Sequence, residues 1–142
     1  MKEIVINACY GGFSLSKEAE SELAKLQGKQ VFWYMQTKYE HTGGINEYQR
    51  VDIHHKGHFY YSLSRDLGET INDIPDGEDV WFPSREIARD NVNLIAIVKK
   101  LGSRADGSCA KLKIVKIPDD VKWVIDEYDG YESVEEEHRS WV

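Results

Sequence analysis

The chain has 142 residues, of which 41% are hydrophobic and 30% are charged, and its formal net charge is −7. This composition is typical of a globular protein and excludes a largely disordered chain. The negative charge disfavours binding to a nucleic-acid duplex or an anionic membrane, and no apolar run approaches the roughly 20 residues of a membrane span.

The length predicts a single domain over residues 1–142, because a chain of this size can bury a core without disulfide staples. Cys9 and Cys109 lie far apart and form no CxxC motif. The start at Met1 lacks the basic and apolar segments of a secretory signal peptide. These features predict a soluble protein of the reducing cytoplasm.

The N-terminal region predicts a β-α-β unit. Residues 2–8 are rich in Ile and Val and predict a strand that enters a glycine-containing loop. Apolar residues recur at helical spacing in residues 17–27, and Ser14 and Ser16 are both suitable N-caps for that helix. The apolar run 31–35 follows and predicts a central strand.

The middle of the chain, residues 36–79, carries a weaker pattern. Strand-forming residues at 50–54 and 58–63, with turn residues Lys56 and Gly57 between them, predict a β-hairpin.

The C-terminal region predicts a helix followed by strands. Asp90 is the expected N-cap of the second helix, which ends at Gly102. Residues 111–116, 121–125 and 131–134 predict an antiparallel meander. The expected class is therefore α+β, with two main helices and a mixed or antiparallel sheet.

The loop of residues 9–14, the glycine loop, is the first candidate site. It lies between a strand and a helix N-terminus, where free N–H groups and the helix dipole favour an anion. Gly11, Gly12 and Phe13 are its candidate ligand-binding residues. An ordinary turn that needs glycine is the alternative interpretation.

A second candidate site surrounds the start of the second helix. Trp81 and Phe82 can stack on a purine, Arg85 can bind a phosphate, and Asn91 or Asn93 can contact a base or ribose edge. The alternative is a set of core aromatic residues beside a solvated pair of arginines, Arg85 and Arg89. Aromatic residues make up 11% of the chain, and they serve either the core or an interface.

Arg104 and Lys111, with Lys113 and Lys116, form the only basic concentration in this acidic sequence. They can neutralise the phosphates of a ligand. A solvated sheet face paired with carboxylates is the alternative.

No self-sufficient catalytic or metal site is expected. Cys9 has no histidine close in sequence that can act as its base. His54, His55 and His58, with His41, lack the spacing of a zinc site. The sequence therefore predicts a protein without cofactor or metal that binds a ligand and does not turn it over.

Two motif regions carry a resemblance to small phage and prophage proteins. They are IVINACYGGFSLS at residues 4–16, and LKIV, IPDDV and EYDG within residues 112–130. In these the chain resembles the first Thoeris anti-defence family, whose members bind cyclic ADP-ribose isomers made by TIR-domain immune enzymes and hold them without cleavage. The resemblance implies a sponge in the host cytoplasm and a homo-oligomer, a hexamer built from dimers or a dimer alone.

On this resemblance, the nucleotide pocket lies near a subunit contact. Phe82 is assigned to stack on adenine, Asn91 or Asn93 to contact the base or ribose, and Arg104 and Lys111 to bind the pyrophosphate. Two hypotheses from other classes stay open: an acidic protein-interaction module that inhibits a host protein, and a small enzyme that depends on Cys9.

Overall fold

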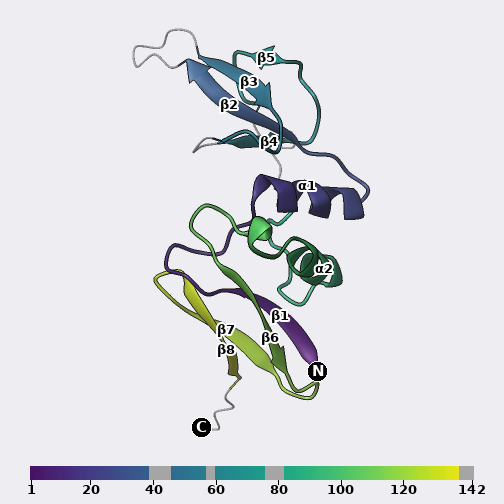
Figure 1. The fold of residues 1–142 in the computed structure, drawn as a ribbon, viewed down its shortest axis with the longest axis vertical. Coiled ribbons are helices and arrows are strands. Elements are labelled where there is room, and N and C mark those ends of the chain that lie inside the picture. Colours follow the sequence, from purple (N-terminus) through teal and green to yellow (C-terminus); the bar gives the residue numbers. More distant parts are fainter. Residues whose placement is uncertain (39–45, 57–59, 76–81, 138–142) are drawn as a thin grey trace. The chain divides into compact units, whose positions relative to one another are not determined.

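The structure, a computed structural model, describes residues 1–38, 46–56, 60–75 and 82–137 and confirms the predicted α+β class (Figure 1). No helix in these ranges is long and apolar enough to cross a membrane. The elements are β1 (Lys2–Asn7), α1 (Lys17–Leu26), β2 (Phe32–Lys38), β3 (Glu47–Val51), β4 (Tyr61–Leu63), β5 (Thr70–Ile71), α2 (Val92–Leu101), the 3-10 helix η2 (Gly102–Ala105), β6 (Leu112–Ile117), β7 (Trp123–Tyr128) and β8 (Tyr131–Glu136).

The strands of the described residues pair antiparallel in three sheets. The chain begins β1-α1-β2, as predicted, but β1 pairs with β6 along its length, and β2 lies in a different sheet. That second sheet has the order β4-β2-β3-β5, and the third is the β7–β8 hairpin at the C-terminal end. Of the expected C-terminal meander, β7 and β8 pair antiparallel with each other, and β6 pairs antiparallel with β1.

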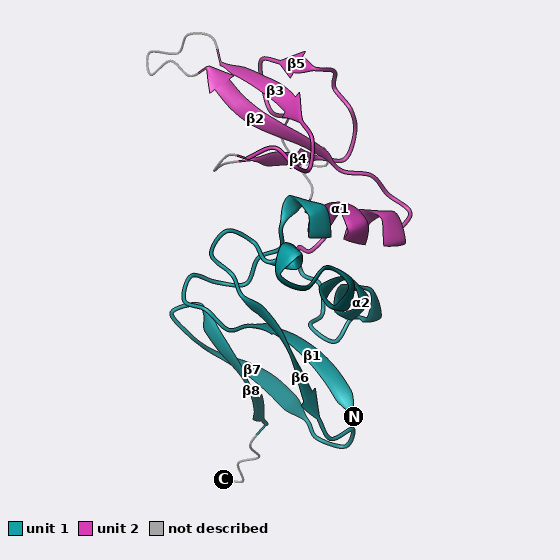
Figure 2. Ribbon diagram, viewed as in Figure 1, with its two compact units in different colours: residues 1–19, 86–142 teal, residues 20–85 magenta. Residues whose placement is uncertain are grey.

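The chain contacts divide into two compact units (Figure 2). Unit 1 comprises Met1–Ala19 and Glu86–Val142, and unit 2 comprises Glu20–Arg85. The prediction of a single domain stays a prediction.

The core of unit 1 lies between β1 and one face of α2, which packs against β1 and β6. Burying apolar side chains stabilises such a layer by about 25 cal/mol per Å² removed from water. The apolar residues of this face recur at helical spacing, so α2 buries a single stripe. Buried residues of this core include Ile4, Val5, Ile6, Leu94, Ile97, Val98 and Leu101.

The N-cap of α2 differs from the prediction by one residue. Asn91, and not Asp90, is the cap: its side chain accepts hydrogen bonds from the backbone N–H groups of Asn93 (2.9 Å) and Leu94 (3.2 Å). Asp and Asn cap helices about equally well, so residue type could not decide between neighbours. At the start of α1, Ser16 is the cap, and its Oγ accepts from the N–H of Ala19 at 3.1 Å.

The hairpin predicted between residues 50–54 and 58–63 is wrong. β3 and β4 do not pair with each other, because each pairs with a different edge of β2. β2 is an interior strand of this sheet, between β4 and β3, and its Trp33 and Tyr34 are buried. The Tyr34 hydroxyl donates to the carbonyl of Gly68 at 2.7 Å and anchors the segment that leads to β5.

Candidate functional site

Asn7 joins three segments of unit 1 at the end of β1. Its side chain is fully buried. Its Nδ2 group donates to the backbone oxygens of Cys9 and Gly130, each at 2.8 Å, and its Oδ1 accepts from the N–H of Lys111 at 2.8 Å. Leaving such a buried polar group unsatisfied costs about 1–3 kcal/mol. Asn7 therefore holds the glycine loop against the turn between β7 and β8.

The turn between β7 and β8 contacts the glycine loop closely. Asp129 (φ 54°) and Gly130 (φ 88°) are both left-handed, which is the geometry of a two-residue type I′ hairpin turn. The N–H of Gly11 donates to the carbonyl of Asp129 at 3.1 Å. A Cβ on Gly130 would lie 2.6 Å from the nitrogen of Gly11 and closer still to that of Gly12. The two backbones can approach this closely only because Gly130 has no side chain.

The ion pair between Arg89 and Glu132 stabilises the same region, where the glycine loop meets the β7–β8 hairpin. Arg89 binds Glu132 with two hydrogen bonds, of 2.6 Å from Nη1 and 2.9 Å from Nη2, and the Glu132 side chain is only 8% exposed. The Arg89 guanidinium also lies 3.6 Å from the ring centroid of Phe13. Glu132 Oε1 accepts in addition from the N–H of Asn7 at 2.8 Å. Glu132 of β8 is thus bound by charge-assisted hydrogen bonds to Arg89 and to the end of β1, and Arg89 contacts the glycine loop through the Phe13 ring.

The outer face of the hairpin presents tyrosines to solvent. Tyr128 and Tyr131 are register partners across the turn, so their side chains share one side. Tyr10 of the glycine loop packs on Tyr131 with ring centroids 5.4 Å apart. Tyr10 is 64% exposed, Tyr128 77% and Tyr131 44%. Exposed residues of β7 and β8 on the same side of the hairpin complete this surface. We call it the tyrosine face, and it consists of Tyr10, Val124, Asp126, Tyr128, Tyr131 and Glu135.

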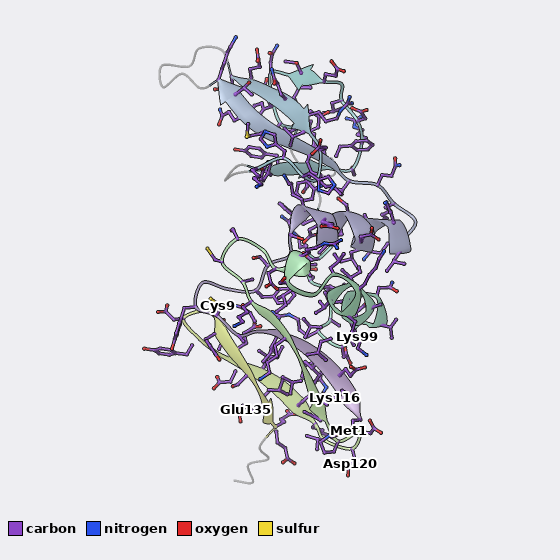
Figure 3. The ribbon with its side chains drawn as sticks, in the orientation of Figure 1. Met1, Cys9, Lys99, Lys116, Asp120 and Glu135 are labelled. Atoms are coloured by element: carbon purple, nitrogen blue, oxygen red, sulfur yellow. The ribbon has the colours of Figure 1, made fainter. Side chains whose placement is uncertain are left out.

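The tyrosine face is acidic as well as aromatic. Asp126 and Glu135 are exposed, and Glu135 lies on β8 toward its C-terminal end, away from the turn (Figure 3). Neither β7 nor β8 contains a lysine or an arginine. A surface with exposed rings and carboxylates suits a cationic partner better than an anion.

The structure places the other predicted residues of unit 1 as follows. Asn91 uses its side-chain oxygen as the cap of α2, next to Asn93. Arg104, in η2, forms an ion pair with Glu18. Lys111 precedes β6 with an exposed side chain, and Phe13 lies beneath Arg89 in the glycine loop with Gly11 and Gly12.

The aromatic part of the predicted nucleotide pocket belongs to unit 2. Phe82 contacts the ring of Trp33 edge to face, with centroids 6.4 Å apart, and the Arg85 guanidinium lies 5.7 Å from the Phe82 centroid. Trp81 lies outside the described residues. Phe82 and Arg85 are thus together in unit 2, whereas Arg104 and Lys111 belong to unit 1.

A buried carboxylate holds the segment that carries Phe82. Glu20 is 3% exposed, its Oε2 accepts from the N–H of Ser84 at 3.0 Å, and its Oε1 accepts from the Ser84 hydroxyl. Burial raises the pKa of Glu20, and the two hydrogen bonds from Ser84 offset part of that rise. The charged form of Glu20 is therefore disfavoured in the folded protein.

We expect Glu20→Gln to change how stability depends on pH. Because the folded pKa of Glu20 is raised, its contribution is fully present below the unfolded pKa and is lost as pH rises through the folded value. Wild type should therefore gain stability relative to Glu20→Gln between pH 7 and pH 4. Urea unfolding at several pH values measures this difference, and parallel pH profiles for the two proteins would contradict it.

The candidate metal ligands and the candidate nucleophile lie in different parts of the described chain. No group of three or more His, Cys, Asp or Glu side chains there is arranged to hold a metal ion. Of the histidine cluster, His54 and His55 are described, in unit 2, while His41 and His58 lie outside the described residues. Cys9 is half-buried in unit 1.

No protein-family model, curated protein or solved structure matches the chain. The resemblance to the first Thoeris anti-defence family therefore stays a prediction. The surfaces of the two units are the basis for assigning a function.

Proposed function

We propose that this chain is a non-catalytic binding protein that docks a basic protein segment on the tyrosine face of unit 1. The observation that carries the proposal is the group of three exposed tyrosines: two lie on a hairpin whose strands carry no basic residue, and the third, Tyr10 of the glycine loop, is in ring contact with Tyr131. This corresponds to the acidic interaction module among the sequence hypotheses.

Tyrosines suit this role because they add contact area at low entropic cost and carry a polar tip. Tyr and Arg are also enriched among the residues that dominate binding energy at interfaces. The tyrosine face is preorganised, since Asn7, Arg89 and Glu132 hold its two segments together. Little conformational freedom is then lost when a partner binds.

Charge supports a basic partner over a second copy of the chain. A two-fold contact through this face would bring Asp126 and Glu135 of one copy close to the same carboxylates of the other. Such like-charge contacts oppose association. Arginine or lysine side chains can instead pair with these carboxylates and stack on the tyrosine rings.

The double variant Tyr128→Ser/Tyr131→Ser tests this proposal. Affinity capture with the wild-type chain, from cells that naturally contain it, should yield a stoichiometric basic partner that high salt releases. The amount of partner captured by the double variant should be at least about tenfold lower, because each tyrosine at such a site contributes on the order of 1–2 kcal/mol to the binding free energy. Its stability should change by less than about 1 kcal/mol, since both side chains are exposed.

Val92→Ser is the matched control, because Val92 is a 77% exposed apolar residue of unit 1 on α2. It should leave capture unchanged. Asp126→Asn/Glu135→Gln should weaken capture and reduce its sensitivity to salt. Equal capture by wild type and the tyrosine variant would refute the proposal.

As a second candidate we propose a nucleotide sponge of the kind that the sequence resemblance implies. The observation that favours it is the Phe82–Arg85 pair, in which an aromatic ring and a guanidinium lie 5.7 Å apart. A ring can stack on adenine while an arginine binds phosphate. The hexamer implied by the resemblance would supply contacts from neighbouring copies.

Cyclic ADP-ribose isomers are the probes for this candidate. Binding should raise the thermal midpoint of the full chain, and the shift should grow with the logarithm of the ratio of ligand concentration to Kd. Heat denaturation should then release unaltered ligand. Phe82→Leu and Arg85→Met should each reduce the shift, and absence of any shift, or release of altered ligand, would reject the sponge.

A further inference from the structure

Unit 2 contains a half-open pocket of about 220 Å³ between α1, the start of β2 and the segment after β3. It does not overlap the tyrosine face or the Phe82–Arg85 pair. Its lining residues are Ser21, Lys25, Gln30, Val31, Phe32 and Ile53. The walls supplied by Val31, Phe32 and Ile53 are apolar, so the pocket favours a ligand with an apolar body.

The polar groups of the pocket come mainly from one face of α1. Ser21 and Lys25 are four residues apart on the helix, so their side chains lie on the same side. The Nε1 group of Trp33 donates to Ser21 Oγ at 3.0 Å. With its oxygen accepting this bond, the Ser21 hydroxyl hydrogen is free to donate to a ligand.

The charge of the pocket is positive. Lys25 is exposed and has no ion-pair partner within the part of the chain that the structure describes. None of the lining residues is acidic. In a chain of net charge −7, a lysine without a carboxylate partner beside an apolar wall is a local site for an anion.

We propose that this pocket binds a free small organic acid with a single carboxylate and one apolar ring. The carboxylate would accept from Lys25 Nζ and the Ser21 hydroxyl, and the ring would contact Phe32 and Ile53. A volume of about 220 Å³ offers room for the single ring of such an acid. The proposal is independent of the tyrosine face.

Three one-ring probes of similar size test the site in the full chain: benzoate, benzyl alcohol and benzylamine. In ¹⁵N NMR titrations, benzoate should give saturable shifts at Ser21, Lys25, Phe32 and Ile53. Benzyl alcohol should bind about tenfold more weakly, because it lacks the charge-assisted hydrogen bonds. Benzylamine should bind more weakly still, since its ammonium is repelled by Lys25.

Lys25→Met should weaken benzoate binding by about tenfold while keeping the length of the side chain. Lys113→Met, which removes the same charge from an exposed position of β6, is the control and should leave it unchanged. Gln30→Glu, which places a carboxylate at the pocket wall without changing side-chain size, should weaken benzoate and improve benzylamine.

Three results would each overturn the proposal: no saturable benzoate shift at the pocket, equal binding of benzoate and benzyl alcohol, or undiminished benzoate binding by both Lys25→Met and Gln30→Glu. Tyr128→Ser/Tyr131→Ser should bind benzoate as wild type does. Failure of the tyrosine-face proposal is thereby distinguishable from failure of this one.

Discussion

Replacing Arg89 by Met is expected to lower the free energy of unfolding by about 3 kcal/mol, at the lower end of the range for a broken buried ion pair. The substitution leaves the Glu132 carboxylate, 8% exposed, without its two guanidinium hydrogen bonds. It also removes the contact of the guanidinium with the Phe13 ring. The Asn7 N–H alone would then satisfy a buried charge.

Urea unfolding followed by circular dichroism measures this loss. The double variant Arg89→Met/Glu132→Leu should recover part of it, because it removes the unpaired charge as well as its partner. Arg50→Met is the matched control in unit 2. Its partner Asp66 is 43% exposed, so the expected change is below about 1 kcal/mol. A loss for Arg89→Met no larger than for Arg50→Met would show that the pair does not support the fold.

The second large effect is expected for Gly130→Ala, which should destabilise the protein by about 3 kcal/mol. About 1–2 kcal/mol comes from placing a side chain at a φ of 88°. The remainder comes from the clash of the new Cβ with the backbone nitrogens of Gly11 and Gly12. The glycine loop must move away from the turn, so Tyr10 and Tyr131 should also separate.

Gly28→Ala separates the two contributions. Gly28 has a similar φ of 73°, and a Cβ there would meet nothing within 4 Å. Its substitution should therefore lose only about 1–2 kcal/mol. If Gly28→Ala and Gly130→Ala are equally destabilising, the close approach between the turn and the glycine loop contributes nothing.

The local elements could be predicted because their signals are local. Apolar spacing gave α1 and α2 to within one or two residues, and the Ile-Val run gave β1. Strand partners could not be predicted in the same way. β1 pairs with β6, more than one hundred residues along the chain, as the pairing of Lys2 with Ile117 shows. The wrong hairpin between residues 50 and 63 has the same cause. Strands that are close in sequence often pair with each other, but here β3 and β4 each pair with a different edge of β2.

The candidate site was predictable only in part. Asp129 and Gly130 indicate a type I′ turn, and that turn alone places Tyr128 opposite Tyr131. Asn7, Arg89 and Glu132 were not predicted as functional residues. The sequence does carry two signals for them: Asn7 is a polar residue at the end of an apolar strand, and Glu132 lies on the opposite side of its strand from Tyr131. Their significance depends on a contact between segments far apart in sequence.

Binding of a cationic peptide to the tyrosine face can be followed residue by residue. The most direct measurement is a ¹⁵N NMR titration of the full chain with a short arginine-glycine peptide at physiological salt. Saturable shifts should be concentrated at Tyr10, Val124, Tyr128, Tyr131 and Glu135, and they should be lost in Tyr128→Ser/Tyr131→Ser. Shifts spread evenly over the acidic residues of both units, or shifts that persist in the variant, would contradict binding at the tyrosine face.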